Sequence, residues 1–326
     1  MLNPTAFART AVAAALVTSL WAGVTTASAQ TPPPPTLAKA QAGYVRMMLG
    51  DAEVTALSDG SVVLQSSILT GAKPEHVADL LKQAHQTGPL HTSVNAYLIK
   101  VGSKLVLVDA GAGSFFGPTL NKLQTSMKAA GYAPDQVTDI VITHLHADHV
   151  GGLVNGDAIQ FPNATVHADK AELDHWLDAA KTEAAPKEAQ GFFKMAQAAL
   201  NPYVKAGKVK PFTGATEIVP GVRTQPTHGH TPGHSFYVLE SQGQKLVFWG
   251  DLMHFEEVQF PEPEITVAFD VDSKAAKAQR LTAFADAAKQ GYLVAPSHVT
   301  FPGIGHLRKQ GNGYVWLPVR YVNDNY

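Results

Sequence analysis

Short stretches of alternating or wholly apolar residues recur along the chain and are separated by turn-forming residues. Alternation with a period of two is typical of strands buried on one face, and short apolar runs are typical of strands buried on both. Asp59-Gly60 lies between two such stretches and predicts a hairpin turn. The predicted strands cover residues 44–48, 53–58, 62–64, 93–101, 104–108, 139–142, 166–168, 208–212, 222–225, 235–241, 245–249 and 292–295.

Other segments place apolar residues three or four positions apart, which predicts helices. These helices cover residues 74–85, 120–130, 170–180, 190–205 and 273–290. We expect Asp169 to cap the third of them and Gly291 to end the last. Strands and helices alternate in two halves, each with polar turns at strand ends. The pattern therefore predicts one α/β domain in which two sheets are covered by helices on their outer faces.

The first residues have the features of a targeting segment. A single charge at Arg9 precedes an apolar run over residues 11–24, and Ala27-Ser28-Ala29 is a small-x-small cleavage site. The run is short for a transmembrane helix, so we expect no stable membrane anchor. We expect residues 1–29 to be a signal peptide that directs export, to a bacterial periplasm. Residues 30–41 would be a disordered, proline-rich leader, and residues 42–326 the folded domain.

Composition excludes several kinds of chemistry. The chain has 326 residues, 45% of them hydrophobic, which is enough for a large core. It contains no cysteine, so disulfides, thiolate metal sites and cysteine nucleophiles are excluded. The formal net charge is -2, and no cluster of Lys and Arg indicates nucleic-acid binding. Any metal must therefore be held by His, Asp or Glu.

The stretch from Thr143 to Gly152 carries the strongest chemical signal in the chain. It contains His144, His146, Asp148 and His149, so three imidazoles and one carboxylate fall within six residues. Imidazole nitrogen and carboxylate oxygen suit zinc and its first-row neighbours. His144 and His146 point the same way in an extended segment and can chelate one ion, while Asp148 and His149 can face a second. A polar turn of surface histidines is the weaker interpretation.

The motif His-x-His-x-Asp-His resembles the signature of the metallo-β-lactamase superfamily of hydrolases. Further pieces occur in that family's order at residues 108–111, 229–234, 250–251 and 297–298. More narrowly, the chain is similar to the methyl parathion hydrolase group, through residues 105–109, 116–120, 191–194, 201–207 and 297–306. The resemblance implies the αββα sandwich of that superfamily and a homodimer.

The resemblance also implies a role for each matched residue. It assigns His144, His146 and His230 to a first metal, and Asp148, His149 and His298 to a second. Asp251 would bridge the two ions and accept a proton, and we count Asp251 and Asp148 as catalytic. Asp109 and His234 would orient the ligands without binding metal. We expect two divalent ions, zinc by default, with manganese, iron or cobalt as alternatives. A hydroxide bridging the ions would be the nucleophile.

Six residues are candidates for the substrate pocket. Phe116, Trp176 and Phe192 match or neighbour the aromatic cluster of methyl parathion hydrolases, although plain core packing is the alternative. His254 and Phe269, with Val267 beside them, depart from the organophosphate enzymes, which carry leucine at the positions of His254 and Phe269. Larger rings there would narrow the pocket and favour a planar group over a tetrahedral phosphotriester.

The sequence therefore predicts a dinuclear metallohydrolase of lactones or aryl esters, such as dihydrocoumarin, with weaker organophosphate triesterase activity. A true methyl parathion hydrolase is the first alternative, and an acyl-homoserine lactonase is another. A non-catalytic periplasmic metal-binding protein is the alternative from a different class. We expect a small-molecule ester, lactone or phosphotriester as the substrate and no nucleic-acid partner.

Overall fold

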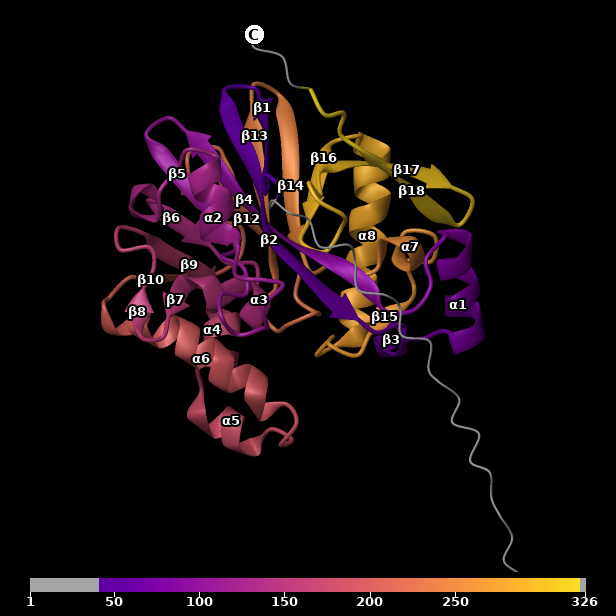
Figure 1. Cartoon of the computed structure of the whole chain (residues 1–326), viewed down its shortest axis with the longest axis horizontal. Coiled ribbons are helices and arrows are strands. Elements are labelled where there is room, and N and C mark those ends of the chain that lie inside the picture. The colour runs from indigo at the N-terminus through magenta and orange to yellow at the C-terminus, as the bar shows by residue number, and fades with distance from the viewer. Residues whose placement is uncertain (1–40, 323–326) are drawn as a thin grey trace, which may run out of the picture. The chain divides into compact units, whose positions relative to one another are not determined.

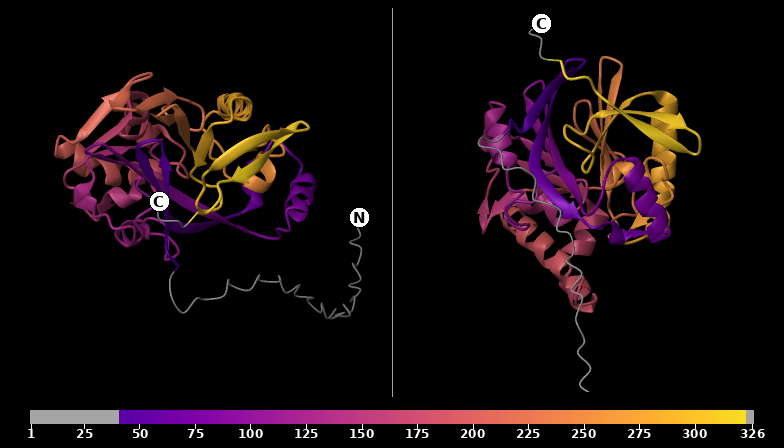
Figure 2. Two further views of the ribbon diagram at one scale, coloured as in Figure 1. Left: turned by 90° about the horizontal axis from the view of Figure 1, so that it is seen from above. Right: turned by 45° about the vertical axis from the view of Figure 1, so that its right-hand side comes forward.

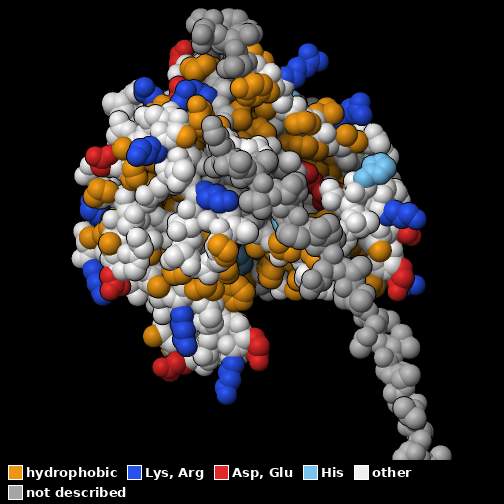
Figure 3. All heavy atoms as spheres, in the orientation of Figure 1, with side chains coloured by type: hydrophobic (Ala, Val, Ile, Leu, Met, Phe, Trp, Pro, Cys, Tyr) orange, Lys and Arg blue, Asp and Glu red, His pale blue; other side chains and the backbone are white. Residues whose placement is uncertain are grey.

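The structure is a computed structural model that describes residues 41–322, which belong to one compact unit. The predicted signal peptide and almost all of the predicted leader lie outside the described residues. Among the described residues, no helix is both long and apolar enough to cross a membrane. On the face that Figure 3 presents, Lys and Arg side chains of the described residues lie singly among acidic and apolar ones.

Seven strands form the first sheet, in the order β1 (Tyr44–Leu49), β2 (Ala52–Leu64), β4 (Leu90–Val101), β5 (Lys104–Val108), β6 (Asp139–Val141), β9 (Thr165–Asp169) and β10 (Val209–Phe212). The strands from β1 to β5 pair antiparallel, and those from β5 to β10 pair parallel. This sheet is mixed, and its parallel half carries the metal-ligand motif.

Seven further strands form the second sheet, in the order β11 (Glu217–Val219), β12 (Val222–Pro226), β13 (Ser235–Ser241), β14 (Gln244–Gly250), β16 (Leu293–Pro296), β17 (Gly305–Gln310) and β18 (Gly313–Pro318). Only β14 and β16 pair parallel. Two short ribbons pair β3 (Leu69–Thr70) with β15 (Thr266–Val267), and β7 (Val154–Asn155) with β8 (Ala158–Ile159).

The two sheets face each other, and helices cover their outer faces (Figures 1 and 2). Ile99 and Val106 of the first sheet share a buried cluster with Leu239 and Phe248 of the second. The outer face of the first sheet packs against α2 (Leu123–Ala129), α4 (Lys170–Trp176) and α6 (Gln190–Lys205). The outer face of the second sheet packs against α8 (Ser273–Gln290), where Phe284 stacks on Trp249. The predicted αββα sandwich is confirmed.

Smaller helices complete the domain. α1 (Pro74–Gln83) contacts α7 (Glu256–Gln259), while α3 (Ala147–Val150) follows β6, and α5 (Ala179–Ala184) precedes α6. The helix predicted over residues 170–180 is in fact two. Asp169 caps α4 as expected, but Asp178 caps α5 by accepting a hydrogen bond from the backbone N–H of Ala180, so the chain turns between them. The sequence pattern did not predict the β17–β18 hairpin.

The hairpin predicted at Asp59-Gly60 is wrong. Residues 52–64 form the single strand β2, which pairs with β4 throughout and shifts register between Ser58 and Gly60. The buried Asp59 carboxylate accepts hydrogen bonds from the backbone N–H groups of Ala112 and Leu123, among others. The Asp59-Gly60 pair therefore forms a β-bulge and not a turn, because the groups that bind the Asp59 carboxylate come from segments far away in the sequence.

Candidate metal centre

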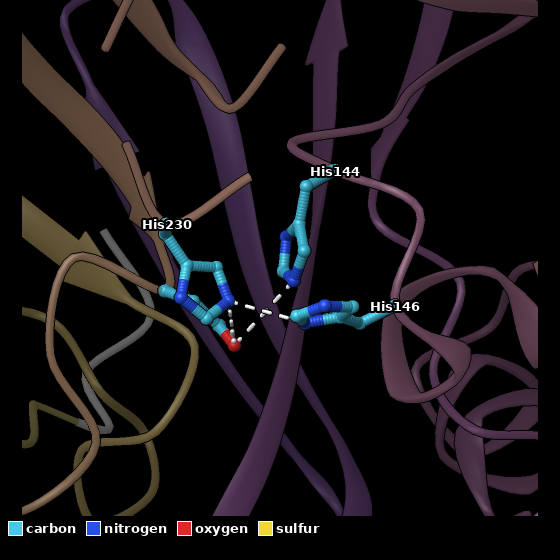
Figure 4. Close-up of side chains that lie close together, drawn as sticks. His144, His146 and His230 are labelled. Atoms are coloured by element: carbon cyan, nitrogen blue, oxygen red, sulfur yellow. Dashed lines mark hydrogen bonds and ion pairs between the residues drawn. The ribbon is translucent and has the colours of Figure 1, made fainter. Parts of the chain in front are cut away.

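The predicted ligands lie in the turns that follow strands or, for Asp148 and His149, in the short helix α3. His144 and His146 follow β6, and α3 begins directly after His146. His230 lies in the turn between β12 and β13, Asp251 follows β14, and His298 follows β16. Figure 4 shows the three imidazoles of His144, His146 and His230 turned toward one another. Loops held by buried strands thus bring together side chains that are far apart in the sequence.

The seven side chains form two groups that share Asp251. In each group the candidate ligand atoms lie within 4.8 Å of one another. The first group contains His144, His146, His230 and Asp251, and the second contains Asp148, His149, His298 and Asp251. The Nε2 atoms of His144 and His230 each lie 3.5 Å from Asp251 Oδ2. The Nε2 atoms of His149 and His298 each lie 3.1 Å from Asp251 Oδ1. His298 Nε2 also lies 3.2 Å from Oδ2, so the carboxylate lies between the two groups and both can share it.

The buried atoms of the two groups fit divalent cations. His144 Nε2, His149 Nε2 and Asp251 Oδ1 are buried without a well-formed hydrogen bond, which is costly unless a cation binds there. Burial, together with the neighbouring His149, lowers the pKa of His144 well below its ordinary value, which leaves a neutral imidazole with a free lone pair. Nitrogen and oxygen donors in this number suit zinc and related metals.

Asp109 holds the ligand loop of the first sheet. Its Oδ2 accepts a hydrogen bond from the Thr143 hydroxyl at 2.8 Å and lies 2.8 Å from His149 Nδ1. Its Oδ1 accepts one from the Thr143 backbone N–H, also at 2.8 Å. A carboxylate can only accept here, so the proton of His149 lies on Nδ1 and Nε2 faces the second group.

His234 supports Asp251 through the backbone. Its Nε2 accepts a hydrogen bond from the Asp251 backbone N–H at 3.1 Å, and its Nδ1 lies 2.9 Å from the Thr227 hydroxyl. Burial, and then the nearby His230, lowers the pKa of His234 to about 3. The neutral ring therefore orients the loop and does not face either group of ligands.

Sequence reasoning missed Asp270. Its Oδ1 lies 2.9 Å from Nδ1 of His230, so it orients that imidazole as Asp109 orients His149. Asp270 also follows Phe269 directly, so it links the pocket wall to a ligand. No local signal marks it, because the pair lies 40 positions apart in the sequence.

A cavity of about 230 Å³ opens onto ligands of both groups, since His146, Asp148, Asp251 and His298 all line it. Phe116, Phe192, His254 and Phe269 line it, as we expected. Val62 and Leu64 of β2, which sequence reasoning did not include, complete its apolar wall. His254 is only 3% exposed, and its ring stacks on that of His298 with centroids 5.1 Å apart. Its Nε2 lies 3.1 Å from Asp251 Oδ2.

Two residues expected at the pocket do not line this cavity. Trp176 lies behind His146, with ring centroids 5.4 Å apart, and its indole N–H donates to Glu172. Val267 is fully buried in the β3–β15 ribbon opposite Leu69. Each instead buries its apolar area in a core cluster, Trp176 under the helices of the first sheet and Val267 against α1 and α7. Neither correction affects the metal ligands.

Comparison with known proteins defines the class to which this site belongs. A profile of the metallo-beta-lactamase superfamily matches residues 91–298, which include all seven candidate ligands. The chain belongs to this superfamily, and it is a metal-dependent, lactonase-like hydrolase.

Individual relatives agree with this assignment. The chain is 37% identical to the solved hydrolase AbOPH of the beta lactamase superfamily, with a TM-score of 0.84 over 87% of this chain and 100% of that one. It is 27% identical to AidC, a dizinc quorum-quenching lactonase, with a TM-score of 0.81 over 86% of this chain and 99% of that one. An N-acyl homoserine lactonase of Bacillus cereus is 28% identical over 211 residues, 59% of this chain and 76% of the relative.

Proposed function

We propose that this chain hydrolyses lactones or aryl esters of planar, dihydrocoumarin-like shape, with two divalent ions held by the seven ligands and zinc as the default ion. The observation that carries the proposal is the cavity beside Asp251 and His298, whose walls are aromatic or aliphatic. Its volume of about 230 Å³ is below the range of roughly 300–1,000 Å³ typical of ligand pockets. A small, flat and largely apolar substrate suits such a space.

The ions and the side chains would contribute to different parts of the hydrolysis. When bound, two divalent ions would lower the pKa of water and polarise the substrate carbonyl. Asp251 lies between the two groups, where its carboxylate can take up the proton that the attacking water gives up. Phe116 and Phe192 would hold the substrate ring and exclude bulk water. Asp148, which is partly exposed to the cavity, would face the departing oxygen.

Organophosphate triester hydrolysis is the weaker activity in this proposal. A tetrahedral phosphorus needs space on several sides, but the imidazole of His254 and the ring of Phe269 lie 5.9 Å apart, centroid to centroid, at the cavity wall. His254 is also held in place by the stack on His298 and by Asp251. These contacts support a pocket that favours planar carbonyl groups. A methyl parathion hydrolase remains the alternative within the same chemistry.

Hydrolysis of acyl-homoserine lactones is a second candidate, because both lactonases in the comparison act on that class of compound. The small volume of the cavity argues against long acyl chains but not against short ones. The alternative from another class, a non-catalytic metal-binding protein, disagrees with the assignment to a superfamily of hydrolases. That role would not need an apolar cavity beside the ligands, so the cavity supports an enzyme. We also propose that the protein is exported, from its apolar N-terminal run and cleavage site, and that it forms a homodimer, from its resemblance to the methyl parathion hydrolase group.

The test is a comparison of initial rates. Metal-reconstituted protein is assayed on dihydrocoumarin, N-hexanoyl homoserine lactone and methyl parathion, with Asp251→Asn as the control, since Asp251 belongs to both ligand groups. We expect the highest kcat/KM on dihydrocoumarin and loss of all activity in the variant. A preference for methyl parathion would overturn the planar-substrate proposal. Metal binding without turnover of any ester would favour the non-catalytic alternative.

A further inference from the structure

Glu172 is a buried carboxylate that belongs to neither ligand group. It lies in α4 and is only 1% exposed. Its Oε1 accepts hydrogen bonds from the Leu145 backbone N–H at 2.8 Å and from the Trp176 indole N–H at 2.7 Å. Its Oε2 accepts one from the Gly233 backbone N–H at 2.7 Å. Each of these partners donates, so the site requires an acceptor at both oxygens.

Each of these partners lies beside a ligand of the first group. Leu145 stands between His144 and His146 in the loop that follows β6. Gly233 lies in the turn of His230, which joins β12 to β13 of the opposite sheet. The indole of Trp176 packs edge-on against the ring of His146. One carboxylate therefore ties together the two loops, from two different sheets, that supply the three imidazoles of the first group.

The packing leaves little freedom at this junction. A Cβ added to Gly233 would lie 2.4 Å from the backbone nitrogen of Glu172, so only glycine permits α4 to approach the His230 turn this closely. The two loops then bring His146 Nδ1 to within 3.1 Å of His230 Nε2. The second group is held differently, by Asp109 on His149 and by the Ser93 carbonyl, 2.9 Å from Nδ1 of His298.

From this arrangement we infer that Glu172 is a positioning residue for the first metal: it sets the separation between the His144–His146 loop and the His230 turn. It touches neither metal nor substrate. A buried carboxylate is costly, and its three hydrogen bonds offset that cost only while both loops stay in place. Glu172 therefore links the geometry of the first metal site to the contact between the two sheets. The second site, which Asp109 and the Ser93 carbonyl hold, does not depend on Glu172.

The experiment is a metal titration of the metal-free, full-length Glu172→Gln variant. Glutamine offers one acceptor oxygen, and its amide NH₂ would face a donor N–H at the other position. We expect one of two Zn²⁺ equivalents to bind about 10- to 100-fold more weakly, the usual effect of losing a group that orients ligands, and the other to bind as in the wild type. Calorimetry measures both affinities, and Co²⁺ absorption spectra report the ligand set of each site.

Asp139→Asn is the matched control. Asp139 is also a buried carboxylate, but it contacts Lys104, Thr138 and His167 rather than a ligand loop. We expect this variant to bind both equivalents with wild-type affinity. Thermal unfolding of each metal-free variant measures the loss of fold stability separately. If Glu172→Gln does not fold, Trp176→Phe removes a single donor, and a smaller loss confined to the same equivalent is expected.

Two results would overturn the inference. One is a Glu172→Gln or Trp176→Phe variant that binds both equivalents with wild-type affinity. The other is an equal weakening of both equivalents together with a lower Tm, because Glu172 would then stabilise only the fold. The inference rests on the proposed two-metal function, but different results would refute the function and the role of Glu172. Wild-type protein that binds no Zn²⁺ would refute the function itself, whereas the variants test Glu172 only once the wild type has bound two equivalents.

Discussion

Asp109→Asn is the substitution that tests most directly how the second ligand group is oriented. Asp109 has a φ of +57°, a left-handed conformation that asparagine tolerates better than most residues, so the backbone at this position should not change. The side chain keeps its size and loses its charge and one acceptor. Any effect on metal binding then reports the hydrogen bonds to His149 and Thr143 rather than a rearranged turn.

The expected loss in metal affinity follows from the hydrogen bonds that the asparagine amide can form. If its NH₂ takes the place of Oδ2, it faces His149 Nδ1, and the imidazole proton must move to Nε2, the atom that faces the second group. If it takes the place of Oδ1, it opposes the Thr143 backbone N–H and leaves a buried donor unsatisfied, at a cost of about 1–3 kcal/mol. We expect the second equivalent to bind about 10- to 100-fold more weakly. That corresponds to about 1.4–2.8 kcal/mol.

The assay is a two-step Zn²⁺ titration with activity measured on the same samples. Asp139→Asn is again the control, because Asp139 is a buried carboxylate whose side chain contacts Lys104, Thr138 and His167 and not His149. The control should lower Tm and leave both metal affinities unchanged. If Asp109→Asn also leaves both affinities unchanged, then Asp109 does not fix the imidazole, and the reasoning from its hydrogen bonds is wrong.

Further predictions concern the pocket, the loop contact, the metal and export. His254→Leu with Phe269→Leu should raise kcat/KM on methyl parathion and lower it on dihydrocoumarin; an unchanged ratio would show that these rings do not set the preference. Gly233→Ala should destabilise the metal-free protein by about 1–3 kcal/mol through its clash with α4, while Gly191→Ala, which faces open space, should not, as thermal unfolding would reveal. Chelation should abolish ester hydrolysis and added Zn²⁺ should restore it, whereas activity that survives chelation would exclude a metal-dependent reaction. Mass spectrometry of the exported protein should find cleavage between residues 29 and 30, and an intact N-terminus would refute the signal peptide.

Several features of the fold could be predicted because their causes are local. The bounds of α6 and α8 agree with the hydrophobic spacing, and Gly291 ends α8 in a left-handed conformation, as expected. The ligand positions could also be predicted, since His144, His146, Asp148 and His149 fall in one short stretch. His230, Asp251 and His298 follow from the family motif, and the structure brings all seven side chains together.

Three of the errors share an origin, which is contact between distant residues. Asp59-Gly60 has the composition of a turn but forms a bulge, because the Asp59 carboxylate binds a loop 53 positions away. Trp176 and Val267 have the chemistry of pocket residues but lie in core clusters instead. Local patterns specify which face of a strand or helix is apolar; they do not specify which neighbour covers it.

The sequence by itself determined the two-sheet architecture, because apolar periodicity acts within a few residues, and its family motif identified the seven candidate ligands. Only the tertiary structure revealed Asp270 behind His230 and Glu172 between the two ligand loops. It alone also set the size of the cavity. These features depend on the packing of one sheet against the other, and the free energy of that packing comes from contacts that no short stretch of sequence contains.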